Sequence, residues 1–430
     1  MSSTDFARLP GFRDFLPEDL AVRSHVFDAW RRVSRRYGFQ EYDGPPLESL
    51  ELYVEKSGEE IVSQLFNFTD KGDREVSLRP EMTPSLARIL ADRSRALPKP
   101  IKWFSIPQLF RYEKQQRGRL REHFQWNVDI AGEEGVGADA EVLAVALDAL
   151  GELGLGSEDI RARVSDRRLL SALLRAGGVA EDRLLAAYGV IDKLEREPRD
   201  RSRERLGTEA GLGPDEADRI LGLFDDPGLD AVATAFGDRD EVAAELERLR
   251  EYMGILDAME LSPLVDFDLT IVRGLAYYTG IVFEIFDRKG EFRAICGGGR
   301  YDSLLERVGG EDLPAVGFGM GDVVLTELLR ERGRLPDSAR HLDYYLVGIG
   351  DETRPRLLTL AHRLRSRGKT VGHGLRPAGV RKQFRSAESE GAAEVVVLGP
   401  DELARGVVTV RNMDSGTERE VGLEALERGS

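Results

Sequence analysis

The stretch from residue 106 to residue 132, IPQLFRYEKQQRGRLREHFQWNVDIAG, carries the residue types best suited to hold a charged ligand. Eight consecutive residues of this stretch, 114–121, contain four cations: Lys114, Arg117, Arg119 and Arg121. Guanidinium groups match phosphate oxygens with paired hydrogen bonds. Further along, Gln125 and Asp129 offer an amide and a carboxylate, which are acceptors for an ammonium group. The stretch therefore predicts a site for a ligand with polyphosphate at one end and an ammonium at the other.

A β-hairpin is the element that would position these groups. Apolar and polar residues alternate after the basic loop, and this period of two is typical of a half-buried strand. The apolar set is Phe124, Trp126, Val128 and Ile130, with Gln125, Asn127 and Asp129 on the opposite face. Leu109, Phe110 and Tyr112 precede the loop as the first strand. An exposed edge hairpin with a solvated charged turn remains an alternative.

A second hairpin, over residues 65–79, is predicted to deliver Arg79, Glu81 and Thr83 to the start of a helix over 84–93. Glu81 would then face the same cleft as the amide and carboxylate of the first hairpin, and three acceptors around one point form a cage for an ammonium group. Alternatively, Thr83 caps the helix and Glu81 interacts with the positive end of its dipole. The two interpretations are compatible.

Residues 265–302 are predicted to form strands around Arg273-Gly274, followed by a glycine triplet at 297–299. An arginine within an apolar strand needs an anionic partner. The neighbouring Tyr277 and Tyr278 offer flat walls with hydroxyl groups, which suit a small planar ring, although a role in the core is equally open. The glycines allow the backbone to approach a ligand or another strand, or they form a tight turn.

Composition limits the class of protein. The chain has 430 residues, enough for two to four domains, and a formal net charge of −16. Cys296 is the only cysteine, so neither an intramolecular disulfide nor a cysteine-based zinc site is expected, and five scattered histidines predict no dedicated metal site. The sequence contains no run of 18 apolar residues, so no membrane span is expected. The first residues lack the apolar core of a signal peptide, so we expect a cytoplasmic protein.

The charge is distributed unevenly. Residues 341–430 hold 14 Lys and Arg against 13 Asp and Glu, so the negative balance lies in the rest of the chain. Within that tail, residues 354–385 contain ten cations and no acid. Such a cluster predicts contact with a phosphate backbone. A solvated basic helix face is the simpler interpretation, and it remains open.

The remaining elements follow from periodicity. Residues 18–37 form one apolar helical face that ends at Gly38, and the strand that follows reaches Pro45-Pro46, which predicts a sheet edge. Residues 137–154 are predicted as a helix. Short helical segments follow to about residue 260, after a small strand near 160–165. After a linker at 333–341, strands alternate with helices, which predicts a small mixed α/β domain.

Phe110-Arg111-x-Glu113 resembles motif 2 of the class II aminoacyl-tRNA synthetases. The segments LRPEMTPSLAR (78–88), IVRGLAYYTG (271–280) and AICGGGRYD (294–302) look like signatures of the histidyl-tRNA synthetase family. The helix and Pro-ended strand near the N-terminus resemble motif 1, and residues 314–331 resemble motif 3. The resemblance runs from about Leu9 to the C-terminus and is weakest across 155–260.

This resemblance implies an α+β fold: a class II antiparallel sheet with flanking helices, a helical insertion, and a C-terminal mixed α/β anticodon-binding domain. The implied domains are residues 1–155 (first part of the catalytic domain, with motifs 1 and 2), 156–262 (insertion), 263–332 (second part, with the histidine signatures and motif 3) and 341–430 (anticodon-binding domain). It also implies a homodimer, formed through motif 1.

The implied activity is that of an ATP-dependent aminoacyl-tRNA ligase, which converts L-histidine and ATP to histidyl-adenylate and then charges the 3′ end of histidine tRNA. Mg²⁺ is expected to arrive with ATP. The implied catalytic residues are Arg111 and Arg273. The implied histidine-binding residues are Glu81, Met82, Thr83, Gln125, Asp129, Arg273, Tyr277 and Tyr278. ATP would be bound by Arg111, Glu113, Arg119, Arg121 and His123, and tRNA by Arg363, Arg376, Arg381, Lys382 and Arg385.

Three positions depart from the family pattern. Val324 stands where motif 3 usually has an arginine for the γ-phosphate; either Arg300 or the loop arginines compensate, or the γ-phosphate is held less tightly. Ala276 replaces a common acid, and His123 replaces an aromatic residue that stacks on adenine. Val324 and Ala276 keep an alternative open: a synthetase-like regulatory subunit of ATP phosphoribosyltransferase, which binds histidine without charging tRNA.

Overall fold

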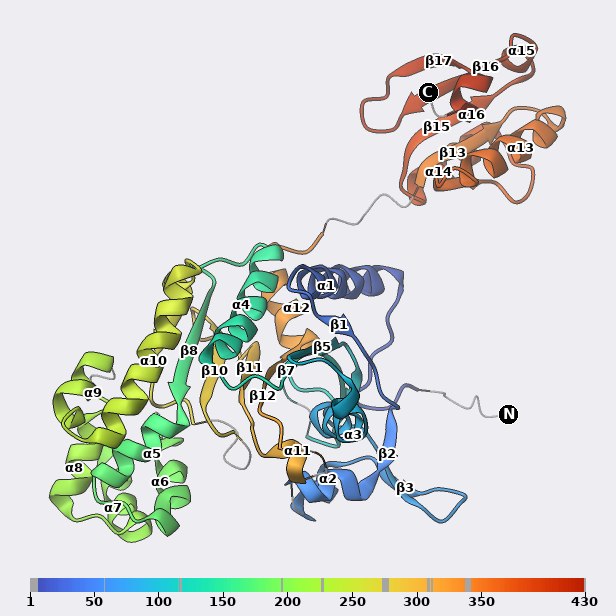
Figure 1. The fold of residues 1–430 in the computed structure, drawn as a ribbon. Helices are drawn as coiled ribbons and strands as arrows, with labels where there is room; N and C mark the ends of the chain where they lie inside the picture. Colours follow the sequence, from blue (N-terminus) through green and yellow to red (C-terminus); the bar gives the residue numbers. More distant parts are fainter. Residues whose placement is uncertain are drawn as a thin grey trace. The chain divides into compact units, whose positions relative to one another are not determined.

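The computed structural model describes residues 7–57, 59–114, 116, 118–194, 196–225, 228–272, 278–307, 310, 312–336 and 342–428. The chain divides into two compact units, Met1–Leu335 and Pro336–Ser430. Each unit has its own sheet and its own buried core (Figure 1). Of the linker predicted at 333–341, residues 337–341 lie outside the described residues.

The first unit is built on a nine-stranded sheet. In sheet order its strands are β1 (Gln40–Glu41), β5 (Ile101–Ser105), β7 (Glu122–Ala131), β12 (Ala315–Gly321), β11 (Cys296–Arg300), β10 (Ile281–Asp287), β8 (Ile160–Asp166) and β9 (Val265–Phe267), and β6 (Gln108–Phe110) pairs with β7 beside this path. Neighbours are antiparallel except at the two ends, where β1–β5 and β8–β9 are parallel. The predicted hairpin is the β6–β7 pair, and β1 lies at an edge, as the prolines that follow it predict.

One face of this sheet is buried beneath helices. The helices α1 (Pro17–Arg36), α4 (Val136–Glu152) and α12 (Asp322–Glu331) contribute Trp30, Leu143 and Leu325 to a core that includes Trp126 of β7 (Figure 1). The indoles of Trp30 and Trp126 stack at 5.7 Å between ring centroids. Helix α1 ends just before Gly38, whose φ of +77° allows the chain to turn back toward β1. Of these helices, α1 was predicted from its periodicity and α12 from the resemblance to motif 3.

The opposite face carries the polar residues of β7, but it is not open to water as the half-buried pattern predicted. Asn127 and Asp129 are only 6% and 7% exposed. The reason is the position of β7 between β5 and β12 in the middle of the sheet, where α3 (Thr83–Arg93) and α11 (Leu304–Arg307) contribute to a second apolar cluster on this face. Both faces of β7 are therefore buried: the apolar residues face the main core, and the polar residues face the side covered by α3 and α11.

Two glycines of β12, Gly317 and Gly319, leave room above this face, and the surface that they form with β7 is called the glycine floor below. Gly317 of β12 pairs with Asp129, and Gly319 pairs with Asn127. A Cβ atom on Gly317 would lie 2.1 Å from Asp129 Oδ1, and one on Gly319 would lie 2.6 Å from Gln125 Nε2. The glycine-rich strand thus leaves the space in which the amide and carboxylate of β7 lie.

The strand expected near 160–165 is β8, but it belongs to the large sheet. Residues 160–166 pair with all of β10, from Asp287 to Ile281. The helices of the predicted insertion begin after it and gather beside the β8 end of the sheet (Figure 1). They are α5 (Arg167–Ala176), α6 (Leu184–Ile191), α7 (Arg199–Ala210), α8 (Pro214–Gly222), α9 (Leu229–Phe236) and α10 (Asp240–Ala258). Asp166 caps α5 through the backbone N–H of Arg168 at 2.7 Å and pairs with Arg248 of α10.

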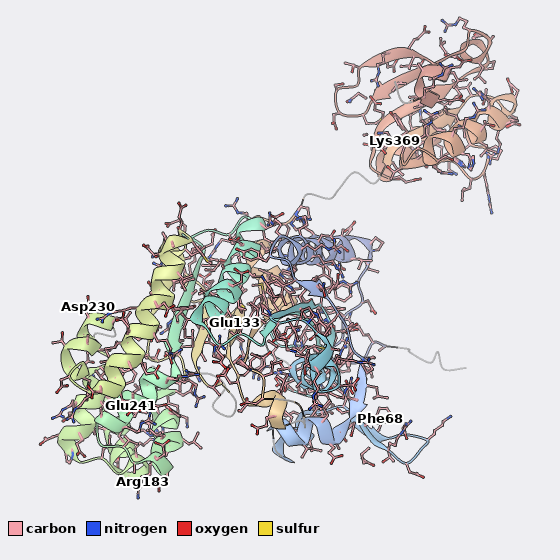
Figure 2. The ribbon with its side chains drawn as sticks, in the orientation of Figure 1. Phe68, Glu133, Arg183, Asp230, Glu241 and Lys369 are labelled. Carbon is pink, nitrogen blue, oxygen red and sulfur yellow. The ribbon has the colours of Figure 1, made fainter. Side chains whose placement is uncertain are left out.

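A small three-stranded sheet in the order β2 (Leu47–Ser49), β4 (Glu75–Leu78), β3 (Asn67–Thr69) completes the unit, together with α2 (Leu50–Ser57). It contains the predicted second hairpin as β3 and β4. On the edge strand β3, the side chain of Phe68 is half exposed (Figure 2). Within the described part of the chain, no helix is long and apolar enough to cross a membrane.

The second unit has a five-stranded mixed sheet. Its order is β14 (Val371–His373), β13 (Leu342–Gly348), β15 (Ala392–Leu398), β16 (Val407–Asn412) and β17 (Glu418–Gly422). Helices α13 (Arg354–Arg365) and α16 (Leu423–Arg428) pack with one apolar cluster, and α14 (Val380–Ser389) packs with another on the opposite face; α15 (Pro400–Ala404) precedes β16. The basic segment 354–385 is therefore divided between two faces, because α13 and α14 cover opposite sides of the sheet.

Candidate functional site

A pocket of about 140 Å³ lies between the β6–β7 loop and the start of α12. Four residues predicted to bind ATP line it: Arg111, Glu113, Arg119 and His123. Val323 and Val324 of α12 form the apolar part of its wall. The hairpin thus contributes two arginines, a glutamate and the ring of His123 to this pocket. The segment that resembles motif 3 contributes only valines and a glycine.

The charged groups of this pocket are already engaged with protein atoms. Arg119 Nε lies 2.8 Å from Glu113 Oε2, and Arg111 Nε donates to the carbonyl of Pro80 at 3.1 Å. Arg121 does not line the pocket, because its guanidinium group lies over the ring of Tyr112, 4.3 Å from the centroid. A nucleotide that bonded to Glu113 would therefore take the place of Arg119 on this carboxylate.

His123 offers a neutral ring on β7. Burial lowers the pKa of His123 to about 3, and the positive charges of Arg111 and Arg13 lower it further in the same direction. The imidazole is therefore uncharged over the physiological range. A neutral planar ring at the pocket wall can stack on a base without adding a charge.

The predicted histidine site lies on the glycine floor beside this pocket. Gln125 is partly exposed there, and Asp129 is buried with its carboxylate accepting a hydrogen bond from the hydroxyl of Tyr301. Glu81 and Thr83 are partly buried at the start of α3. The side chain of Met82 is buried and contacts Arg79, so only its backbone is available to a ligand. Thr83 does not cap α3, because no side chain caps that helix.

Arg273 and Tyr277 lie outside the described residues, as do Ala276 and the loop cation Arg117. Tyr278 is described and packs against the apolar cluster of α3 and α11. Of the predicted ATP ligands, the structure brings Arg111, Glu113, Arg119 and His123 together around one pocket.

Arg300 cannot replace the missing arginine of motif 3. Its side chain is only 2% exposed, and its Nη2 atom lies 2.6 Å from Asp139 of α4. The same guanidinium group donates to the carbonyls of Glu133 and Gly135. It joins β11 to the start of α4 on the core side of the sheet. Arg79 has a similar structural role, bonding to Asp43, to the carbonyl of Gly44 and to that of Gln108.

Sequence reasoning missed an ion-pair network behind the pocket. Arg13 Nε lies 2.6 Å from Glu122 of β7, and its Nη1 lies 2.9 Å from Asp322 of α12. Asp322 also accepts from the backbone N–H of Phe124 at 2.9 Å. Burial raises the pKa of Asp322, and Arg13 opposes this shift. The sequence shows Arg13 within the N-terminal segment LPGFRDF, but its two partners lie more than a hundred residues away, so the pairing could not be predicted.

The predicted tRNA-binding residues do not share one surface. Arg376, Arg381, Lys382 and Arg385 lie on α14 or the loop before it; all four are exposed, and none forms an ion pair with another described residue. Arg363 lies on α13, across the sheet, and pairs with Glu427 of α16. The four predicted residues at α14 are therefore free of ion pairs among the described residues, whereas Arg363 on α13 is paired with an acid.

The arrangement as a whole suits the binding of a nucleotide beside a small zwitterion. Arginines face the pocket where phosphates would lie, and acceptors on the adjoining floor suit an ammonium group. The two sites adjoin along β7, so a carboxylate on the second ligand could reach the α-phosphate of the first.

Comparisons with known proteins point to one family. The model of the histidyl-tRNA synthetase family matches residues 11–322, and that of the anticodon binding domain matches residues 343–428. A histidine–tRNA ligase of Opitutus terrae is 44% identical over 98% of this chain and 97% of its own length.

Solved structures agree on the fold. The histidyl-tRNA synthetase of Nostoc sp. PCC 7120 superposes with a TM-score of 0.84 over the whole of both chains, at 24% identity. A Bacillus halodurans protein described as an ATP phosphoribosyltransferase regulatory subunit/histidyl-tRNA synthetase gives 0.77 at 25% identity, over 92% of this chain and 99% of its own. These findings confirm the predicted fold class and enzyme class, an ATP-dependent aminoacyl-tRNA ligase. The chain belongs to the histidyl-tRNA synthetase family.

Proposed function

We propose that this protein activates L-histidine with ATP and transfers the histidyl group to the 3′ end of histidine tRNA. The observation that carries the proposal is the pocket that joins Arg111, Glu113, Arg119 and His123 beside the acceptors of β7, in a chain of this family. The match of residues 343–428 to an anticodon binding domain supports tRNA as the second substrate.

In the first step, a carboxylate oxygen of histidine attacks the α-phosphorus of ATP and the bond to the bridging oxygen of pyrophosphate breaks. The nucleophile is already ionised, so catalysis consists of positioning and of stabilising charge on the phosphoryl oxygens. Arg111 contacts the α-phosphate from one side and Arg273 from the other. Arg119 and Arg121 contact the outer phosphates, Glu113 accepts from the adenine amino group, and His123 stacks on the base.

Histidine lies on the glycine floor. Its ammonium group is held by Glu81, Thr83, Gln125 and Asp129, and the backbone of Met82 borders the same place. Tyr277 and Tyr278 enclose its ring. The hydrogen bond from Tyr301 fixes the Asp129 carboxylate before the ligand arrives. In the second step, a ribose hydroxyl of the terminal nucleotide attacks the carbonyl carbon and AMP leaves.

Mg²⁺ is carried to the site by ATP. The acids around the pocket favour this route, because Glu113 is paired with Arg119, and Glu122 and Asp322 are both paired with Arg13. No group of three or more potential metal ligands occurs in the part of the chain that the structure describes. Oxygen atoms of the nucleotide would supply most of the ligands of such an ion, which neutralises the charge of the outer phosphates.

The enzyme acts as a homodimer in the cytoplasm, where charged tRNA is used. The dimer is proposed on the resemblance of α1 and the Pro-ended strand after it to motif 1, and Phe68 on the edge strand β3 is an exposed apolar side chain at which a second copy could pair. Sedimentation at micromolar concentration tests the dimer: Phe68→Glu is expected to shift the protein toward the monomer.

The proposal is tested by charging. Purified protein with ATP and radiolabelled histidine should label an unmodified histidine tRNA at its 3′ end and leave a phenylalanine tRNA unlabelled. The alternative, a histidine-binding regulatory subunit, is favoured by the name of the Bacillus halodurans neighbour and by Val324 and Ala276. It predicts histidine binding without any labelled tRNA.

A further inference from the structure

The segment that precedes α1 is joined to the hairpin of the nucleotide pocket. The carbonyl group of Gly11 accepts hydrogen bonds from the backbone N–H groups of Arg121 and Glu122, at 3.0 and 3.3 Å. These two residues lie where the β6–β7 loop ends and β7 begins. The segment therefore holds the side chain of Arg13 close to the strand that carries His123.

Arg13 bridges two elements that line the nucleotide pocket. Its Nε and Nη2 atoms lie 2.6 and 3.3 Å from the two carboxylate oxygens of Glu122, and its Nη1 atom lies 2.9 Å from Oδ2 of Asp322. Glu122 directly precedes His123 in β7, and Asp322 begins α12, two residues before Val324. One guanidinium group thus joins the strand that carries the neutral ring to the helix that forms the apolar wall.

The two acids form further hydrogen bonds within the same network. Glu122 Oε2 also accepts from Nε2 of Gln108 in β6 at 3.1 Å, and Asp322 Oδ1 accepts from the backbone N–H of Phe124 at 2.9 Å. Both acids are buried. Desolvation offsets most of the attraction in a buried ion pair, so the net stability that such a pair adds is small. What the network provides is a fixed geometry between β6, β7 and α12.

Arg13 lies behind the nucleotide pocket. It lines a neighbouring pocket of about 300 Å³, and the two pockets share Leu120 and Val323 in their linings. Its hydrogen-bond donors face two carboxylates, and its Cζ atom lies 4.9 Å from the ring centroid of Phe15. The arginine therefore acts on a bound nucleotide through the elements that it holds.

We propose that Arg13 is a positioning residue for ATP: its bridge sets the separation of His123 and Val324, and with it the width of the slot that receives the adenine base. The inference rests on the proposed function, in which His123 stacks on that base. Because Val324 carries no charge, the slot holds the base by van der Waals contact. A gap of about 0.5–1 Å forfeits roughly a quarter to a half of that attraction, so the separation matters.

Arg13→Lys tests the bridge and keeps the charge, because an ammonium group lacks the planar fork that reaches both carboxylates. In histidine-dependent ATP–pyrophosphate exchange, the KM for ATP should rise by roughly tenfold, as for one lost charge-assisted contact, and the KM for histidine should stay within about twofold. Arg205→Lys in α7 is the matched control and should change neither KM. Arg205 is similarly buried, with 18% of its side chain exposed against 24% for Arg13, and it also pairs with two carboxylates, those of Glu197 and Glu209.

Inorganic tripolyphosphate distinguishes the slot from the phosphate site. It has the phosphate chain of ATP without the base, so it should compete with ATP through the arginines that line the pocket. Its inhibition constant should be the same for the wild type and for Arg13→Lys, since only the slot is altered. If the inhibition constant of tripolyphosphate rises as much as the KM for ATP, Arg13 supports the phosphates and the assignment to the base is overturned.

Asp322→Asn removes the α12 end of the bridge and keeps a side-chain oxygen for the N–H of Phe124. It should raise the KM for ATP as much as Arg13→Lys does, and the double variant should raise it no further, because both substitutions break the same link. Additive effects, or a normal KM for ATP in Arg13→Lys, would overturn the inference. A wild-type protein without exchange contradicts the proposed function, whereas wild-type exchange beside a normal Arg13→Lys contradicts this inference alone.

Discussion

At the residue scale, the nucleotide pocket contains Arg111, Glu113 and Arg119 but has a valine where motif 3 usually has an arginine. Val324 leaves the α12 wall without a cation, and Arg300, the only fully buried arginine among the largest buried side chains described, is committed to Asp139. Among the described residues, Arg119 is the loop arginine that lines this pocket, since the guanidinium group of Arg121 lies over Tyr112. We therefore expect the outer phosphates to depend more on Arg119 than on Arg121.

Arg119→Ala should raise the KM for ATP by roughly tenfold or more, which corresponds to loss of about 1.4 kcal/mol or more of binding. The KM for histidine should change little, because the glycine floor is unaffected. Adding Val324→Arg to this variant should restore part of the affinity by returning a cation to the wall. Exchange kinetics at varied ATP provide the measurement, and an Arg119→Ala variant with normal KM would remove the loop arginine from the account.

The depressed pKa of His123 has a consequence for stability at acid pH. The ring stays neutral in the folded protein down to a pKa of about 3, whereas the unfolded chain takes up a proton near 6.5. Below pH 6.5 the unfolded state binds more protons, so the free energy of unfolding falls with pH by up to about 1.4 kcal/mol per unit until pH 3.

His123→Phe should abolish this part of the acid sensitivity and keep the stacking surface. Urea unfolding at pH 7 and at pH 4.5 measures the loss of stability, which should be smaller in the variant than in the wild type. His362→Phe, at an exposed position of α13, is the control and should behave as the wild type. An identical pH dependence in all three proteins would mean that His123 is protonated in the folded state.

At the element scale, the glycines of β12 determine where the polar groups of β7 can lie. A Cβ on Gly319 would lie 2.6 Å from Nε2 of Gln125, whereas one on Gly321 would meet nothing within 4 Å. Both residues are in the same strand, and neither has a positive φ. This contrast provides a pair of substitutions for the histidine site, since Gly321 instead lines the nucleotide pocket and caps α12.

Gly319→Ala should displace the Gln125 amide and raise the KM for histidine by roughly tenfold, as expected when one hydrogen bond to a charged group is lost. Gly321→Ala should leave that KM unchanged. Thermal unfolding of both variants is the control for folding, since only the ligand site should differ. If the two substitutions have equal effects on histidine, the glycine floor does not position the amide.

At the scale of the whole molecule, the two units divide the work between chemistry and tRNA selection. The second unit has its own core, and four exposed cations without an ion pair among the described residues, Arg376, Arg381, Lys382 and Arg385, lie on α14 or the loop before it. Its sheet separates them from Arg363, which Glu427 neutralises. We therefore expect the tRNA backbone to lie against α14.

Arg381→Ala/Lys382→Ala/Arg385→Ala should weaken tRNA binding and flatten its dependence on salt, because about three phosphate contacts are removed. Pyrophosphate exchange should be unaffected. Arg363→Ala should have a smaller effect on tRNA affinity, since its charge is already paired. Filter binding at several salt concentrations distinguishes these outcomes, and a larger loss in Arg363→Ala would place the tRNA on the α13 side.

The sequence predicted the elements better than their pairing. The β6–β7 hairpin, α1 and the C-terminal alternation all follow from local periodicity, and the confirmed family follows from short motifs. The membership of β8 in the large sheet could not be predicted, because its partner β10 lies more than a hundred residues further along the chain. The same holds for Arg300: its partner Asp139 is 161 residues away, so a buried ion pair resembled a free phosphate ligand. Alternation on β7 predicted two faces but not that both are covered.

The most direct test of the central claim is histidine-dependent ATP–pyrophosphate exchange by the purified protein in the absence of tRNA. We expect robust exchange with histidine and none with other amino acids, and we expect Arg111→Ala to abolish it while circular dichroism shows a folded protein. Tight histidine binding without any exchange would contradict the account and favour the regulatory alternative.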